Sequence, residues 1–174
     1  MTSPSQNSID LSSFAGNWEL DRDRTSIEFH TKALWVLPAK GTFRALEGKG
    51  AVAGDGGVSG TLVIDAASVD TNNKRRDTHL RTADFFDVET FPTMTYEVTS
   101  GRLSGTGTVD LDGTFTVHGE SRPLAVSAKL GRTADSVTVS AEFDIDRSAW
   151  GLTLTPFGAG VKNRVVISAQ FRKS

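Results

Sequence analysis

The densest group of side chains that could do chemistry lies in one short stretch near the middle of the chain. Asp77, His79 and Arg81 alternate there, with Arg76 and Asp84 close by. An imidazole beside a carboxylate can act as general acid and base, and arginine can pair with a phosphate or a carbonyl oxygen. The group could therefore hold a polar headgroup or transfer protons. It also fits a salt-bridged network that fixes a helix to strand ends, and we favour that structural role.

Other kinds of site find less support. His30, His79 and His118 are the only histidines, and none has a neighbour spaced as in H-x-H or H-E-x-x-H. No serine lies in a G-x-S-x-G turn, and Gly105 and Gly107 lack the further glycines of a dinucleotide-binding loop. There is no cysteine for a disulfide or a thiolate. We therefore predict no metal site and no catalytic residue.

Length and charge narrow the class of protein. The 174 residues suit one domain, and a net charge of −2 with mixed signs argues against a nucleic-acid partner. The first fifteen residues are polar, so we see neither a secretory signal nor a transmembrane segment, and the initial Met suggests an intact start. We expect a cytoplasmic protein with a disordered segment at 1–15 and a single domain at 16–174.

Most of the chain alternates apolar and polar residues with a period of two, which is typical of strands. We interpret Asp21 to Arg24 as a charged turn, 55–57 as a hairpin turn and 118–121 as another turn. Asp112-Gly113 allows either a hairpin or a bent continuous strand, and we favour the strand because the alternation keeps its phase. About eight strands result, at 18–20 and 25–31, 41–52, 59–65, 93–100, 109–117, 123–130, 137–145 and 163–172.

One helical segment, at about 72–88, interrupts these strands. Residues 74–81 contain neither Gly nor Pro and follow helix-initiating residue types at 70–72, so they predict a short helix. Thr82 resembles a second N-cap, and Pro92 excludes further helix. The apolar residues of the segment need a surface to cover, so we expect the helix to cap an open end of the sheet.

Strands of around ten residues, roughly 30 Å long, favour a closed up-and-down barrel over a sandwich. Inward positions include Ala128, Ala141, Ala169 and Gly113, which are too small to fill such a barrel. The remaining space would be a narrow apolar tube suited to a hydrocarbon chain, and each buried CH2 contributes about 0.8 kcal/mol. The alternative is a packed interior with no cavity, since any β-protein shows apolar alternation.

Several segments in the same order and spacing closely resemble the YceI-like family, over nearly the whole chain from Trp18 to Phe171. The most specific are RDTHLR at 76–81, DFFD at 84–87 and FPTMTY at 91–96. Supporting matches are WELD at 18–21, TSIEF at 25–29, GTF at 41–43, SVDT at 68–71, TFTVHG at 114–119 and RS at 147–148. Tyr96 and Glu97 depart from the family's more usual Phe-Thr pair.

The resemblance implies an all-β, eight-stranded antiparallel lipocalin-like barrel that binds a polyisoprenoid or similar long-chain amphiphile. Family members are often dimers, which allows a homodimer here, and many are secreted, so the absent leader is a departure. The only cofactor-like group expected is a bound polyisoprenoid, quinone or other long-chain lipid.

We therefore predict a non-enzymatic lipid-binding protein that could transport or store its ligand. The alternative is an enzyme acting on a lipid-like substrate with His79 and a nearby carboxylate. The predicted ligand-binding residues are Phe29, Phe43, Leu62, Ile64, Leu80, Phe85, Met94, Phe115, Phe143 and Trp150 in the lumen, with Arg76 and His79 at the headgroup.

Overall fold

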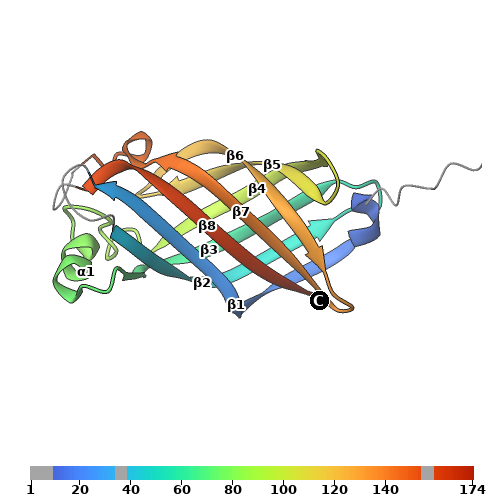
Figure 1. Ribbon diagram of the computed structural model, residues 1–174, viewed down its shortest axis with the longest axis horizontal. Helices are drawn as coiled ribbons and strands as arrows, with labels where there is room; N and C mark the ends of the chain where they lie inside the picture. Colours follow the sequence, from blue (N-terminus) through green and yellow to red (C-terminus); the bar gives the residue numbers. More distant parts are fainter. Residues whose placement is uncertain (1–9, 34–38, 154–158) are drawn as a thin grey trace, which may run out of the picture.

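A computed structural model describes residues 10–33, 39–153 and 159–174. Eight strands follow one another around a closed antiparallel barrel, and the last strand pairs with the first (Figure 1). The strands are β1 (Gly16–Ala33), β2 (Ala39–Val52), β3 (Val58–Asp70), β4 (Thr93–Leu103), β5 (Thr108–Val117), β6 (Glu120–Arg132), β7 (Ser136–Asp146) and β8 (Ala159–Lys173). The helices are η1 (Leu11–Phe14), α1 (Lys74–Arg81) and η2 (Arg147–Trp150). The predicted eight-stranded barrel with one short α-helix is confirmed.

The turns follow the local sequence. Between β2 and β3, Gly56 adopts a φ of 89° and the Gly57 N–H donates to Asp55 Oδ1 at 2.9 Å, as expected for this hairpin. Between β5 and β6, His118 and Gly119 have φ values of 54° and 75°. These two residues form the whole turn, so it is shorter than the predicted 118–121. The run through Asp112-Gly113 is one continuous strand, as predicted.

The predicted charged turn at Asp21 to Arg24 is wrong, because these residues lie within β1. Residues 22–25 form a bulge opposite Ala169 of β8 alone, and Figure 1 shows a sharp bend in β1. Thr25 supports the bulge: its Oγ1 donates to the Asp21 carbonyl at 2.8 Å. A bulge can carry charged residues on the outer face without ending the strand, so charge density was a misleading signal.

The helix α1 occupies residues 74–81 as predicted, but the helical segment does not continue to 88. Asn73 is the N-cap, and its side-chain oxygen accepts from the Arg76 N–H at 3.1 Å. Thr82, predicted as a second N-cap, is instead the C-cap of α1: its N–H and its hydroxyl both donate to the His79 carbonyl. The chain then continues through turns.

Hydrogen bonds to the backbone hold α1 against the end of β3. Arg81 donates from Nε to the Ala67 carbonyl at 2.8 Å and from Nη2 to the Val69 carbonyl at 3.1 Å. The buried Asp77 carboxylate accepts from both the N–H and the hydroxyl of Thr71. The structural role that we favoured for this charged group is therefore supported, with backbone acceptors in place of most of the expected salt bridges.

Gly113 lets an aromatic ring lie across the inner wall. A Cβ atom at this position would come within 2.5 Å of the Glu97 carbonyl oxygen and 2.8 Å of the Tyr96 ring. The carbonyl belongs to the paired strand and has little freedom to move. By contrast, a Cβ at Gly131 would meet Thr138 only at 3.8 Å, an ordinary contact.

Gly113→Ala should therefore lower the free energy of unfolding by about 1–3 kcal/mol, the usual cost of overpacking. Gly131→Ala, in a strand of the same barrel, is the matched control and should change it by less than about 0.5 kcal/mol. Urea denaturation measures both values. Equal stability of the two variants would contradict this account of the inner wall.

Candidate functional site

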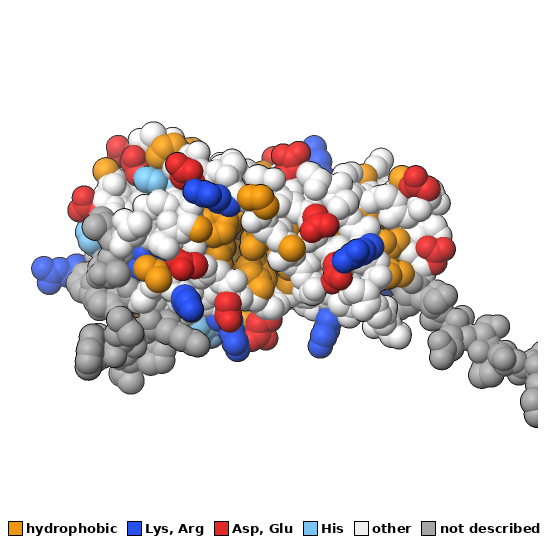
Figure 2. Space-filling model, turned by 90° about the horizontal axis from the view of Figure 1, so that it is seen from above, with side chains coloured by type: hydrophobic (Ala, Val, Ile, Leu, Met, Phe, Trp, Pro, Cys, Tyr) orange, Lys and Arg blue, Asp and Glu red, His pale blue; other side chains and the backbone are white. Residues whose placement is uncertain are grey.

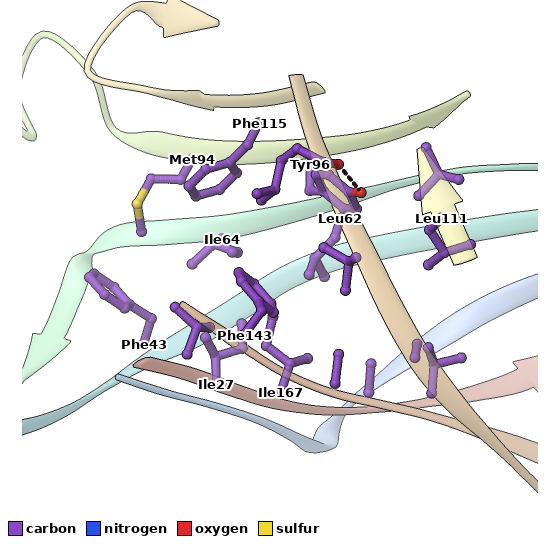
Figure 3. A pocket seen from close by; sticks show the side chains of 18 of the residues that line it. Ile27, Phe43, Leu62, Ile64, Met94, Tyr96, Leu111, Phe115, Phe143 and Ile167 are labelled. Carbon is purple, nitrogen blue, oxygen red and sulfur yellow. Dashed lines mark hydrogen bonds between the residues drawn. The ribbon is translucent and has the colours of Figure 1, made fainter. Parts of the chain in front are cut away.

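The barrel encloses a cavity of about 360 Å³, to which all eight strands contribute. Its walls are almost entirely aliphatic and aromatic, and Figure 3 shows side chains from several strands pointing into it. This volume lies within the roughly 300–1,000 Å³ range of small-molecule pockets. A fully packed interior, the alternative left open by the apolar alternation, is therefore not what the fold has.

Small residues leave this space. Ala128, Ala141 and Ala169 all line the cavity, as their inward phase predicted. Ala128 and Ala141 lie directly opposite each other on β6 and β7, and Ala141 faces Ile167 of β8. Each of these three neighbouring strands thus places an alanine methyl group on the wall where a larger side chain would fill part of the lumen.

Eleven of the twelve predicted ligand-binding residues line the cavity, and His79 does not. Those on the wall are Phe29, Phe43, Leu62, Ile64, Arg76, Leu80, Phe85, Met94, Phe115, Phe143 and Trp150. They lie on the lumen wall because alternate residues of a strand point inward and because α1 and the residues after it cover one end of the barrel. Their contact with a ligand stays a prediction.

Aromatic rings crowd the end of the cavity beneath α1. The ring centres of Phe29 and Phe43 are 5.3 Å apart, and Phe43 meets Phe86 edge-on at 5.6 Å. Phe85 and Phe86 are also perpendicular, at 4.7 Å. Edge-to-face contacts of this kind add to the stabilisation from burial. The predicted apolar surface under the helical segment is thus the lumen itself.

The same end carries the buried polar groups of the wall. Thr31 donates from its hydroxyl to Asn163 Oδ1 at 2.5 Å, and both side chains are buried. Arg76 donates from Nε to Thr71 Oγ1 at 2.7 Å and from Nη2 to the Thr71 carbonyl at 2.8 Å. All four residues line the cavity, so polar side chains belong to its wall at the α1 end.

Arg147, at the start of η2, is a second arginine at the cavity wall, and it is buried whereas Arg76 is half-buried. Its guanidinium donates to the Leu152 carbonyl and lies 5.1 Å from the centre of the Phe85 ring. Burial lowers the pKa of Arg147, while the Asp146 carboxylate partly opposes that shift. In the sequence, Arg147 stands out only as part of the RS motif at 147–148, so the residue pattern does not predict it as a site residue.

Tyr96 is another wall residue absent from the predictions. Its hydroxyl donates to the Leu124 carbonyl at 2.7 Å, the dashed line in Figure 3. Burial raises the pKa of Tyr96 to about 12, with a smaller contribution from the Asp112 carboxylate. Its alternation with Met94 and Val98 along β4 was visible in the sequence and placed it on the inner face.

The opposite end of the cavity is closed by apolar groups from η1 and the start of β1. Leu11, Phe14 and Trp18 are buried and line the cavity. Trp18 donates from its indole N–H to the Phe14 carbonyl at 2.8 Å. Residues 1–15 were predicted to be disordered; residues 1–9 lie outside the described chain, and the sequence pattern did not predict the helix η1.

His79 and Asp84 form a pair outside the cavity. His79 Nε2 lies 3.4 Å from Asp84 Oδ2, and Asp84 is 70% exposed. The imidazole and carboxylate that the enzyme hypothesis requires are therefore adjacent, but this histidine is not among the residues that face the lumen. Among the described residues, no three His, Asp or Glu side chains are grouped as metal ligands.

These features define a closed antiparallel barrel with a hollow apolar lumen and with buried polar side chains among the aromatic rings at one of its ends. The chain belongs to the YceI-like family, since the model of the YceI-like domain matches residues 18–172. No helix in the described ranges is long and apolar enough to cross a membrane.

Curated relatives agree with this assignment. A UPF0312 protein of Ectopseudomonas mendocina is 38% identical over 92 residues, which cover 52% of this chain and 48% of that protein. A UPF0312 protein of Vibrio cholerae is 29% identical over 127 residues, covering 71% of this chain and 67% of that protein. The chain thus matches about half of the first relative's length.

Solved structures share the fold. Burkholderia cenocepacia BcnA superposes with a TM-score of 0.77 at 19% identity, covering 87% of this chain and 98% of that one. A polyisoprenoid binding domain from Saccharophagus degradans, implicated in plant cell wall breakdown, superposes with a TM-score of 0.73 at 19% identity. That match covers 90% of this chain and 98% of that domain.

The single tyrosine permits a direct test of the lumen's polarity. In the native protein, the tyrosinate absorbance should rise with a midpoint near pH 12, compared with about 10 for a solvated tyrosine. Because the unfolded chain loses this proton first, stability should fall as pH rises from about 10 towards 12. A native midpoint at 10 would show that Tyr96 is solvated.

Proposed function

We propose that this protein binds a long-chain amphiphilic lipid, such as a polyisoprenoid, with its hydrocarbon chain inside the barrel. The observation that carries the proposal is the hollow lumen of about 360 Å³ with its almost wholly apolar wall. Water gains few hydrogen bonds there, whereas each CH2 moved from water into the lumen contributes about 0.8 kcal/mol. The structural likeness to a polyisoprenoid binding domain supports the same class of ligand.

The two ends of the lumen differ, which suggests how the ligand lies. Leu11, Phe14 and Trp18 surround the η1 end, where a hydrocarbon tail would pack. Arg76 and Arg147 belong to the α1 end, and each carries hydrogen-bond donors on a permanent positive charge. We therefore propose that the polar head lies beneath α1 and that it is an acceptor group, either an anion such as a phosphate or a carbonyl oxygen.

A protein that binds a lipid and catalyses no reaction on it can transport or store that lipid. An acid-base pair formed by His79 and Asp84 lies outside the lumen, so no observation favours the enzyme alternative for a ligand held inside it. A non-enzymatic carrier is the function that we propose, and a lipid co-purifying with the protein is its first consequence. Mass spectrometry of an organic extract of freshly purified protein would detect that lipid.

Filling the lumen should abolish binding. Ala141→Phe places a ring in the space between β6 and β7, so retained lipid and uptake of added polyprenol should both fall at least about tenfold, as expected when apolar contact is lost. Lys129→Phe adds the same ring at an exposed position of β6 and should leave binding unchanged. Wild-type binding in Ala141→Phe, with a normal melting transition, would count against an occupied lumen.

Removing a guanidinium should discriminate between headgroups. Arg76→Met keeps the aliphatic length but removes the donors, so the Kd for a polyprenyl phosphate should rise about tenfold, the effect of one charge-assisted hydrogen bond. The Kd for the uncharged polyprenol should change much less. Arg75→Met, at the exposed neighbouring position, is the control. Equal effects on both lipids would argue against a head beneath α1.

A further inference from the structure

The ladder between β6 and β7 covers only part of the two strands. It runs from the pair Ala128–Ala141 to the pair Arg132–Val137, although β6 begins at Glu120 and β7 continues to Asp146. On their other sides, β6 stays paired with β5 as far as Glu120, and β7 stays paired with β8 as far as Asp146. In the described chain, the barrel wall is therefore interrupted between residues 120–127 and residues 142–146.

The sequence of β6 gives a local reason for this interruption. The two-residue turn before it makes Val117 and Glu120 a hydrogen-bonded pair, and the pattern then alternates along the antiparallel ladder. The backbone nitrogen of Pro123 consequently points towards β7, at a position where any other residue would offer an N–H to that strand. Because proline has none, β6 cannot make a complete ladder here and resembles an edge strand.

The cavity reaches this interruption from inside. Leu124 on β6 and Phe143 and Ile145 on β7 line the cavity, and all three side chains are only partly buried. Figure 2 shows apolar side chains gathered in a hollow on the upper side of the barrel, where Figure 1 places β5 and β6. The break is thus bordered by apolar side chains that belong both to the lumen and to the partly exposed wall, and we call it the slot.

Hydrogen bonds hold the described parts of both ends in place. At the η1 end, Arg132 donates to the Ser13 carbonyl at 3.0 Å, and its guanidinium lies 5.1 Å from the centre of the Phe14 ring. At the α1 end, Arg81 is bonded to two carbonyls of β3. Moving either element would break these bonds. Between residues 120–127 and 142–146 no ladder bond has to break, and the bonds from Arg122 to the Ala149 carbonyl and from Trp150 to the Phe115 carbonyl hold η2 beside the slot.

We propose that a long-chain ligand enters and leaves the barrel sideways, through the slot between β6 and β7. The inference rests on the proposed lipid binding and adds the route. An elongated chain can slide between the two rims while side chains such as Leu124 and Phe143 change rotamer, and these changes need not disturb the rest of the barrel. Arg122 sits at one end of the slot, where its Nε donates to the Ala149 carbonyl of η2 at 3.0 Å.

Cross-linking the rims tests this route in the whole protein. If the ladder continued in register, Ala125 would lie opposite Asp144, and both are exposed. The native chain has no cysteine, so the variant Ala125→Cys/Asp144→Cys can be bridged by a short, reducible bifunctional thiol reagent. Stopped-flow fluorescence then follows transfer of cis-parinaric acid, a long-chain amphiphile, between phosphatidylcholine vesicles and the protein.

We expect uptake and release to be at least about tenfold slower after bridging, with a smaller change in the amount bound at equilibrium, since a blocked route alters rates more than affinity. Reduction of the bridge should restore the wild-type rates. The control is Lys129→Cys/Ser140→Cys, bridged where the two strands are already paired, and its rates should not change.

Bridged and reduced proteins that exchange the probe at equal rates would overturn the side route while leaving the lipid-binding proposal intact. If neither the wild type nor any variant took up the probe, both proposals would fall. Arg122→Gln gives an independent measurement, because loss of its bond to η2 should speed release by about fivefold. Unchanged or slower release in that variant would contradict the slot as the path.

Discussion

The whole structure depends on closing a backbone ladder around a space that its own side chains do not fill. A closed sheet removes the edges that would otherwise pair with other chains, and it fixes the distance between opposite walls. Once that distance is set, residue volume decides whether the interior is solid or hollow. Ala128, Ala141 and Ala169 lie where three neighbouring strands meet, and their small side chains leave the lumen open.

A hollow apolar interior costs stability, and the molecule limits that cost at the two ends. At one end, Trp18 and Phe14 pack together and are tied by an indole hydrogen bond. At the other, Phe85 and Leu80 join the core cluster that α1 covers. Within the described ranges, the buried arginine, threonine and asparagine side chains lie at this second end, where each has a hydrogen-bond partner. The lumen therefore has a direction, apolar at η1 and polar at α1.

The barrel is also uneven around its circumference. Strand β1 is bent by a bulge at residues 22–25, and β6 separates from β7 beyond Ala128. Both irregularities interrupt the ladder without opening the sheet elsewhere, since the neighbouring pairs continue. The bulge lies part-way along β1, whereas the interruption of the wall runs from Ala128 and Ala141 to the end of the barrel at which β6 begins.

Strand phase, turn chemistry and helix capping were accessible from the sequence, because each depends on residues close together in the chain. They predicted the eight strands, the helix at 74–81, the continuous strand through Gly113 and eleven residues of the cavity wall. Arg147 was missed because its burial depends on how η2 folds over the end of the barrel. His79 was predicted at the headgroup because it alternates with Asp77 and Arg81 close to Arg76, and it is not among the residues that line the lumen.

The sequence by itself determined the alternation of apolar and small residues, and hence a barrel with something left unfilled. Only the tertiary structure decided which strands pair along their full length, where the wall stops, and which arginines reach the cavity. The physical reason is the sequence separation of the interacting residues. The direction of a side chain is set by residues next to it in the chain, whereas the volume of a lumen and the gaps in its wall depend on strands that are far apart in the chain.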